Sequence, residues 1–333
     1  MTEGVIHMLS SLNSFIEKRM AIVTPLCVLA GVAFPEITGK WQPLVPFIFA
    51  FMTFIGGLKS SVPELIDVIR KPRPLLLSLL GLHVIVPLLA LLVGNLLFPG
   101  DDNVITGMVL EFIVPSAVVG LMWSSIYHGS SPLSLALVII DTVLAPFSIP
   151  LTLHILLGEI VHIDAAEMMQ ELLFMIAVPA VLAIILNEAT HGFTRCVWPG
   201  KLAIVSKLCL ILVVSSNSSK ISSYVRNIAP RDFLIALAIL LIAASGYAVG
   251  WLLANLLHEK YEIKTSMMFG CGMRNINAGA VIAGSYFPAE VMFPVMVGTL
   301  FQQLLAVAYG TLLTHRTAVT GGKGTGAGAE QGQ

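Results

Sequence analysis

The sequence predicts an all-α membrane protein that crosses the bilayer about ten times. Of its 333 residues, 56% are hydrophobic and only 11% are charged, and the mean hydropathy is +0.90. The apolar residues gather into runs close to the roughly 20 residues that a spanning helix needs. Two of these runs contain residues that interrupt a helix. A soluble domain is excluded by this composition, and no basic cluster suggests a nucleic-acid partner.

The apolar runs divide the chain into ten expected spans, of which the first two are short and the fourth and ninth are broken. Before them, residues 1–17 carry apolar side chains at helical spacing, which favours an amphipathic helix on the membrane surface. A disordered start is the alternative reading. Residues 315–333 are rich in glycine and are expected to be disordered, which leaves residues 18–314 as the membrane domain. The spans are expected at 20–35, 42–58, 74–98, 104–127, 131–157, 167–188, 201–219, 232–257, 264–287 and 290–314.

Basic residues in the loops predict the orientation, because cytoplasmic loops carry an excess of Lys and Arg. With an even number of spans, both termini lie on one side. Most Lys and Arg residues fall on that side, and Lys40, Lys220, Arg226 and Arg231 fall on the other. The prediction is a multi-pass protein of the cell membrane with both termini in the cytoplasm.

The two halves of the chain contain the same features in the same order. Residues 112–152 contain a proline-broken segment followed by a long helix, and residues 270–313 contain a Gly-Arg-Asn break followed by a long helix. Each half has five spans, and because five is odd, the second half enters the membrane upside down. Two inverted five-helix repeats are the architecture of many secondary transporters.

The stretch from Thr265 to Pro288 has the wrong chemistry for a plain spanning helix. Its centre, residues 270–277, reads GCGMRNIN, and Arg274 is the one Lys or Arg expected deep in a span. A charge at the bilayer centre costs at least about 2.5–3.5 kcal/mol on insertion scales, so such residues usually face a cavity or a partner. We interpret the stretch as an interrupted helix that forms half of a substrate site, with Asn275 and Asn277 beside the arginine. The alternative is a helix with a glycine packing face and a structurally paired arginine.

The fourth span supplies the other half of the expected site. Pro115 removes a backbone hydrogen bond and bends the helix, and Ser116 follows it. Glu111 lies one turn earlier, where a carboxyl group is costly and a functional role is the default hypothesis. The alternative is a glutamate near the outer interface that reaches water along its stem.

Asp141, in the middle of the fifth span, is the most convincing intramembrane acid. Its expected partner is Arg274, because one buried charge without the other is costly; a purely structural ion pair is the alternative. His83 on the third span is more often a packed residue than a ligand in such a position. On the tenth span, Gln302 or its neighbour Gln303 is expected to point into the bundle.

No enzyme signature is present in the sequence. There is no H-E-x-x-H zinc pair, no G-x-S-x-G elbow and no phosphate-binding glycine loop. We therefore expect no catalytic residues, no cofactor and no structural metal site, and a membrane enzyme is the least favoured class.

Residues 18–314 resemble the bile acid:sodium symporter family. The likeness is carried by FMTFIGGLKSS, RKPRPLLLSLLGLHVIVP, LSLALVIIDTVLAPFSIP and, most strongly, GMRNINAGAVIAGSYFP. The resemblance implies a transporter domain with a panel (spans 1, 2, 6 and 7) and a core (spans 3–5 and 8–10). It also implies that the broken fourth and ninth helices cross each other at the site.

The family's sodium ligands are largely replaced in this sequence. By resemblance, a glutamate of the ninth helix falls on Gly270 and a glutamine on Arg274, a fourth-helix Ser-Asn pair falls on Gly120 and Leu121, and a fifth-helix threonine becomes Val138. A hard cation needs oxygen ligands. Only a weak residual sodium site, at Ser134 and Thr142, is expected.

These expectations describe a secondary transporter of small organic anions, such as bile-acid-like or carboxylate substrates, that works by alternating access in the lipid bilayer. Sodium coupling is doubtful, so proton coupling and uniport stay open. A transport-inactive sensor or scaffold with the same fold is the alternative. The expected substrate-binding residues are Arg274, Asn275, Asn277, Ser116, Asp141, Glu111, His83 and Gln302.

Overall fold

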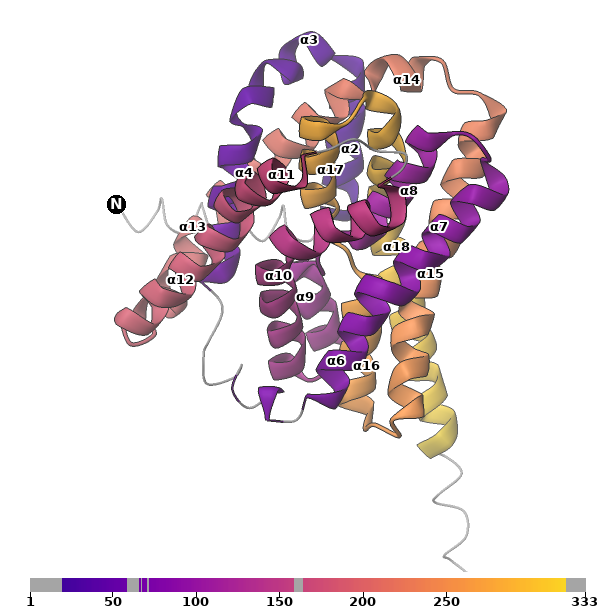
Figure 1. Cartoon of the computed structure of the whole chain (residues 1–333). Coiled ribbons are helices and arrows are strands. Elements are labelled where there is room, and N and C mark those ends of the chain that lie inside the picture. The colour runs from indigo at the N-terminus through magenta and orange to yellow at the C-terminus, as the bar shows by residue number, and fades with distance from the viewer. Residues whose placement is uncertain (1–19, 59–65, 67, 71, 159–163, 322–333) are drawn as a thin grey trace, which may run out of the picture.

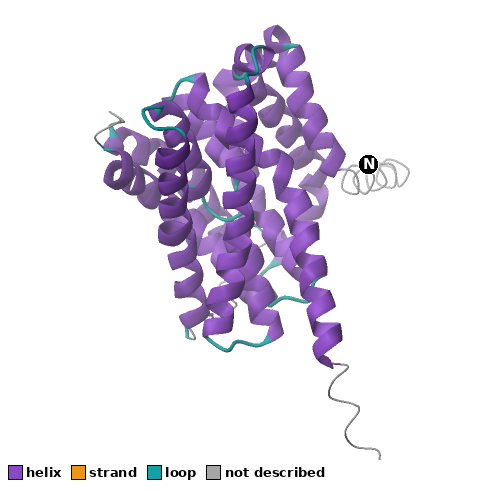
Figure 2. Ribbon diagram, turned by 90° about the vertical axis from the view of Figure 1, so that its right-hand side faces the viewer, coloured by secondary structure: helices purple, strands orange, loops and turns teal. Residues whose placement is uncertain are grey.

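The described part of the chain is almost entirely helical. The computed structural model describes residues 20–58, 66, 68–70, 72–158 and 164–321, and within these ranges the one β-type pairing is a single bridge between Ser116 and Arg274. Most loops lie at the two ends of a bundle whose helices run along its length (Figure 2). The predicted all-α membrane fold is confirmed.

Figure 1 shows the order of the helices along the chain. The first half contains α2 (Met20–Ala33), α3 (Pro35–Thr38), the 3-10 helix η1 (Gly39–Leu44), α4 (Val45–Gly57), α6 (Arg73–Leu80), the π-helical turn η2 (Gly81–Ile85), α7 (Val86–Leu97), α8 (Asp102–Ile113), α9 (Val118–Ile126) and α10 (Ser131–Leu157). The second half contains α11 (Ala165–Leu172), the π-helical turn η3 (Leu173–Ala177), α12 (Val178–Ala189), α13 (Phe193–Lys220), α14 (Ser222–Arg226), α15 (Pro230–Leu256), α16 (Tyr261–Gly272), α17 (Ile276–Tyr286) and α18 (Ala289–Gly321).

Six continuous helical stretches of the described chain are long and apolar enough to cross a membrane. The other four expected spans are those for which the sequence predicts a short or broken helix. α2 and α4 have 14 and 13 residues, and the fourth and ninth spans are divided into α8 with α9 and α16 with α17. The protein is a multi-pass membrane protein.

Side-chain exposure follows the pattern of a protein surrounded by lipid. Leu88, Leu92 and Leu96 recur every fourth residue on α7, and all three are exposed, whereas Ser134 and Asp141 on α10 are buried. Large apolar side chains therefore cover the outside, and polar side chains lie between the helices, where they can find partners.

The helices pack as two sets. α13 packs against α2 and α4, and α12 packs against α4; elsewhere α15 packs against α16 and α18, and α8 against α7 and α18. In Figure 1, α12 and α13 lie at the left of the molecule, and α7 and α15 lie at the right.

Glycines bring α15 and α16 into close contact. A Cβ at Gly250 would overlap the Met267 carbonyl, and a Cβ at Gly272 would overlap the Tyr247 ring. Small residues at a helix interface allow backbones to approach closely in a membrane. Gly272 thus has a packing role, as the alternative reading expects of the glycines, and it is the last residue of α16.

The end of the chain corrects one expectation. α18 continues to Gly321, so residues 315–321, expected to be disordered, are helical, because no proline or glycine occurs between Thr314 and that residue. Residues 322–333 and the amphipathic segment expected at 1–17 lie outside the described residues.

Candidate functional site

The two broken helices meet at their breaks and exchange backbone hydrogen bonds. The Ala117 N–H donates to the Met273 carbonyl at 3.0 Å, and the Asn275 N–H donates to the Pro115 carbonyl at 2.7 Å. These bonds flank the antiparallel bridge between Ser116 and Arg274. Non-helical backbone inside a membrane is tolerated when it is satisfied within the protein. The predicted breaks and their approach are confirmed, although the second break is narrower than expected because α16 extends to Gly272.

Local sequence explains both breaks. Val114 has ψ 151°, an extended conformation, which is the one that a residue before proline prefers. In the second break, the Asn275 side chain accepts a hydrogen bond from the Ala278 N–H at 3.3 Å and so caps α17. Asparagine is one of the preferred N-cap residues because its oxygen satisfies a free amide of the first turn.

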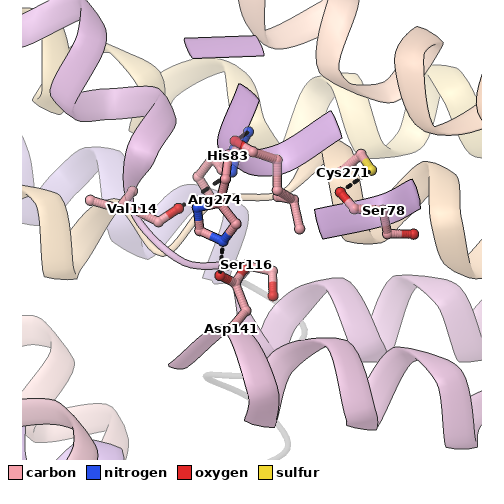
Figure 3. Close-up of polar contacts among 8 residues, drawn as sticks. Ser78, His83, Val114, Ser116, Asp141, Cys271 and Arg274 are labelled. Atoms are coloured by element: carbon pink, nitrogen blue, oxygen red, sulfur yellow. Dashed lines mark hydrogen bonds and ion pairs between the residues drawn. The ribbon is translucent and has the colours of Figure 1, made fainter. Parts of the chain in front are cut away.

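Arg274 is buried in the crossover, with 3% of its surface exposed. Its Nη2 donates to the Leu82 carbonyl at 3.1 Å and its Nη1 to the Val114 carbonyl at 3.4 Å (Figure 3). Val114 is the C-cap of α8, so the guanidinium lies at the negative end of that helix dipole. In this state the arginine is a fixed cation that binds backbone oxygens.

The Leu82 carbonyl has no backbone hydrogen bond from the following helical turn, because η2 is a π-helical turn. The Val86 N–H, its α-helical donor, bonds instead to the Gly81 carbonyl. The next candidate donor is residue 87, a proline, which has no N–H. The π-helical turn therefore leaves a carbonyl directed at the site, where the arginine uses it.

Asp141 is fully buried, with 0% of its surface exposed. Its Oδ2 accepts a hydrogen bond from the Ser116 N–H at 2.6 Å, and its Oδ1 lies 2.7 Å from His83 Nε2 (Figure 3). The carboxylate thus lies beside the N-terminus of α9, the positive end of that dipole.

The direct ion pair expected between Asp141 and Arg274 is not formed, which corrects the sequence interpretation. The carboxylate binds a backbone amide and an imidazole, and the guanidinium binds two carbonyls. Each group occupies the end of a half-helix whose dipole has the opposite sign, so both charges are compensated without contact.

Two glutamines of α18 form hydrogen bonds with the two broken helices. Gln302 Nε2 donates to the Arg274 carbonyl at 2.8 Å, and Trp123 Nε1 donates to Gln303 Oε1 at 2.8 Å. Trp123 is a residue of α9 that sequence reasoning missed. Both glutamines point into the bundle, as expected for at least one of them.

Ser116 and Asn277, two of the expected site residues, lie in or next to the first turns of the half-helices. Ser116 Oγ is buried and has no hydrogen-bond partner. Asn277 lies in the first turn of α17 and is partly exposed. α9 begins without a side-chain cap, so hydrogen-bond donors of two half-helix N-termini remain at the crossover.

Glu111 does not reach the outer interface, so that reading is wrong. It is 2% exposed, its Oε2 has no hydrogen-bond partner, and its carboxyl occupies the space beside Gly298 of α18 where a Cβ would stand. Gly298 has no side chain, so the Glu111 carboxyl can lie against α18. No residue spacing in the sequence indicates this contact.

The residues expected to hold residual sodium do not form a site. Ser134 and Thr142 are eight residues apart on α10, about 12 Å along the helix. Ser134 Oγ donates to Ser124 Oγ at 2.8 Å, and Ser124 Oγ lies 3.0 Å from Ser266 Oγ.

At Gly270, a Cβ would lie 2.8 Å from Leu137 Cδ1, so an apolar side chain fills the space beside it. The donor set is therefore a few neutral hydroxyls next to a leucine. This does not fit a sodium ion, which requires several oxygen ligands.

Apart from Thr194, the buried side chains of α13 lie at its C-terminal end. No side chain of residues 195–212 is buried, whereas all of residues 213–218 are. Near the buried end, Lys220 Nζ donates to the Gly284 carbonyl of α17. This contact joins α13 to α17 at that end.

Comparison with known proteins agrees with this architecture. Residues 46–225 match the model described as the Sodium Bile acid symporter family. The uncharacterized protein YbaS of Bacillus subtilis (strain 168) is 38% identical over 296 residues, which cover 89% of this chain and 97% of YbaS. The uncharacterized sodium-dependent transporter YocS of the same organism is 23% identical over 88% of this chain and 90% of its own. The probable sodium/metabolite cotransporter BASS3, chloroplastic, of Arabidopsis thaliana is 23% identical over 85% of this chain and 65% of its own.

YocS and BASS3 carry the names of a transporter and a cotransporter, which supports a secondary transporter of small molecules rather than an enzyme. The family model matches more than half of the chain, and YbaS aligns along nearly its whole length. This chain therefore belongs to the sodium bile acid symporter family.

Proposed function

We propose that this protein transports small organic anions, such as bile-acid-like or other carboxylates, and binds them at the crossover. The observation that carries the proposal is the pair of half-helix N-termini, α9 and α17, brought together beside a buried cation. Helix N-termini bind anions through their free amides and their dipole, and transporters of this kind use them in that way.

The substrate carboxylate would contact the amides of both first turns, Ser116 Oγ and the side chain of Asn277. Ser116 Oγ has no protein partner, and Asn277 is partly exposed. Arg274 would act through its charge, because its guanidinium is already bound to two carbonyls. Asn275 and Gln302 would hold the break in place.

Transport would proceed by alternating access, with a core of spans 3–5 and 8–10 moving against a panel of spans 1, 2, 6 and 7. The packing of α13 against α2 and α4, and of α12 against α4, supports this division. With both termini in the cytoplasm, the end where Lys220 contacts the Gly284 carbonyl would face outward.

Sodium would not take part, because the residues at the family's sodium positions do not fit the ion. A fixed guanidinium replaces one ligand, and Leu137 fills the space beside Gly270, where another is expected. Arg does not release its proton in practice, so this cation stays with the protein during transport.

Uptake of cholate, pyruvate and pantoate into proteoliposomes tests the proposal, with Asn277→Asp as the test variant and Asn277→Ser as its control. Asp adds a negative charge at nearly the same volume on a partly exposed position, so we expect about a tenfold loss of affinity, equal to about 1.4 kcal/mol. The serine variant should lose less. Equal uptake by all three proteins would refute the site, and binding without uptake would indicate a sensor.

A further inference from the structure

We propose that His83 is a proton-binding residue of this site and that the proton it binds enters with the substrate anion. The inference rests on the proposed anion transport and adds the coupling ion. It is carried by the geometry of His83, Asp141 and the crossover.

The imidazole has one ring nitrogen free to accept a proton. His83 Nε2 lies 2.7 Å from Asp141 Oδ1. An ionised carboxylate accepts hydrogen bonds and cannot donate them, so in the neutral imidazole the hydrogen is on Nε2 and the lone pair is on Nδ1. His83 Nδ1 is buried and has no hydrogen-bond partner. A proton arriving at this atom displaces no existing bond.

His83 is also the accessible member of the pair. Its side chain is 16% exposed, whereas that of Asp141 is 0% exposed. Asp141 Oδ2 is occupied by the Ser116 N–H. The proton is therefore assigned to the imidazole, and the carboxylate would hold the imidazolium and link it to the first turn of α9.

Other charged or titratable side chains on the surrounding elements are few. Arg274 binds the Leu82 carbonyl next to His83, Cys271 on α16 donates to the Ser78 carbonyl of α6, and α15 contributes Tyr247. Glu111 on α8 has a buried oxygen without a partner, which fits a neutral acid because an ionised carboxylate there would lack a hydrogen bond.

The charge balance couples the proton to the anion. With neutral His83, the charges of Asp141 and Arg274 cancel. One proton on Nδ1 makes the cluster +1, and one monovalent anion at the crossover makes it neutral again. A neutral loaded site is cheaper to move across a membrane than a charged one. One proton and one anion would then cross together, and no covalent bond changes apart from the N–H.

The first test observes the proton without any substrate. The ring nitrogens of 15N-histidine-labelled protein in detergent are followed by NMR from about pH 8 to about pH 5, where histidine ordinarily changes charge. The His83 signals are assigned by their loss in His83→Gln. We expect hydrogen on Nε2 alone at the upper pH and on both nitrogens at the lower. Signals that do not change, or a neutral ring with hydrogen on Nδ1, would overturn the proposal.

The second test measures accumulation of cholate, pyruvate and pantoate in sodium-free proteoliposomes. A proton gradient of one pH unit should drive about tenfold accumulation by the native protein, and an imposed membrane potential should not alter it, because the cycle is electroneutral. His83→Gln, whose amide can still donate to Asp141, should lose the response to the gradient. His154→Gln, on the exposed surface of α10, should keep it.

The outcomes separate the two proposals. If no probe is transported although His83 titrates as expected, the transport proposal fails for these anions and the proton site stands. If His83→Gln responds to the gradient as the native protein does, the coupling role is refuted and anion transport stands.

Discussion

Two buried polar regions lie close together in the core and differ in one respect, their charge. At the crossover, Arg274, Asp141 and His83 place charged or titratable groups against backbone carbonyls and amides. Beside it, Ser124, Ser134 and Ser266 form a chain of neutral hydroxyls bonded to one another. The comparison indicates that the guanidinium of Arg274 supplies a permanent positive charge at the crossover. The serine region contains only neutral hydroxyls and needs no such charge.

The largest effect is expected from removing the attached cation. Arg274→Gln removes the charge that balances Asp141 at a distance and the guanidinium that donates to two buried carbonyls. Breaking a buried charge arrangement in this way costs about 3–5 kcal/mol. We expect a clear fall in the thermal unfolding temperature in detergent and loss of anion uptake. Arg274→Lys, which keeps the charge but cannot reproduce the planar donors, should lose less. Equal stability of the two variants would show that hydrogen-bond geometry, rather than charge, holds the crossover together.

A smaller effect is expected from neutralising the acid. Asp141→Asn can still accept the Ser116 N–H but removes the charge that balances Arg274 at a distance, so we expect a loss of about 2 kcal/mol. The double variant with Arg274→Gln should be less destabilised than the sum of the single losses, by about 1–3 kcal/mol. Denaturation of all four proteins in mixed micelles measures this coupling. Strict additivity would contradict the idea that the two charges balance without touching.

The serine region should respond weakly. Ser134→Ala removes one neutral hydrogen bond, to Ser124 Oγ, and should cost about 1 kcal/mol. Thr142→Val, on a partly exposed position of the same helix, serves as the control and should be nearly neutral. A loss for Ser134→Ala as large as that for Asp141→Asn would mean that the serines hold a charged species.

Replacing sodium with another cation is expected to leave anion uptake almost unchanged. Anion uptake by the native protein, measured at fixed pH with sodium exchanged for potassium or choline, should change by less than about twofold, because the neutral oxygens of the serine region are too few for the ion. Ser134→Ala should behave alike in all three salts. A rate that collapses without sodium would show that hydroxyls and backbone carbonyls still build a sodium site.

The class of fold and the places where the helices break can be predicted from the sequence alone. Long apolar runs need a bilayer, and Pro115 and the residues around Arg274 cannot continue a plain spanning helix. The short first two spans and the burial of Asp141 follow from the same local rules. These properties depend on neighbours along the chain, so they can be derived without the fold.

The partners of the buried polar groups can be seen only in the tertiary structure. The arginine binds two carbonyls and the aspartate binds an imidazole and an amide, where the sequence suggested that the two charges pair directly. Pro87 is the one local signal that predicts a free carbonyl near Leu82, and nothing in the sequence indicates that Arg274 reaches it. Charges in a membrane interior need a compensating partner, but helix dipoles and free carbonyls serve as well as opposite charges. Their positions depend on how the helices cross, which no single segment specifies.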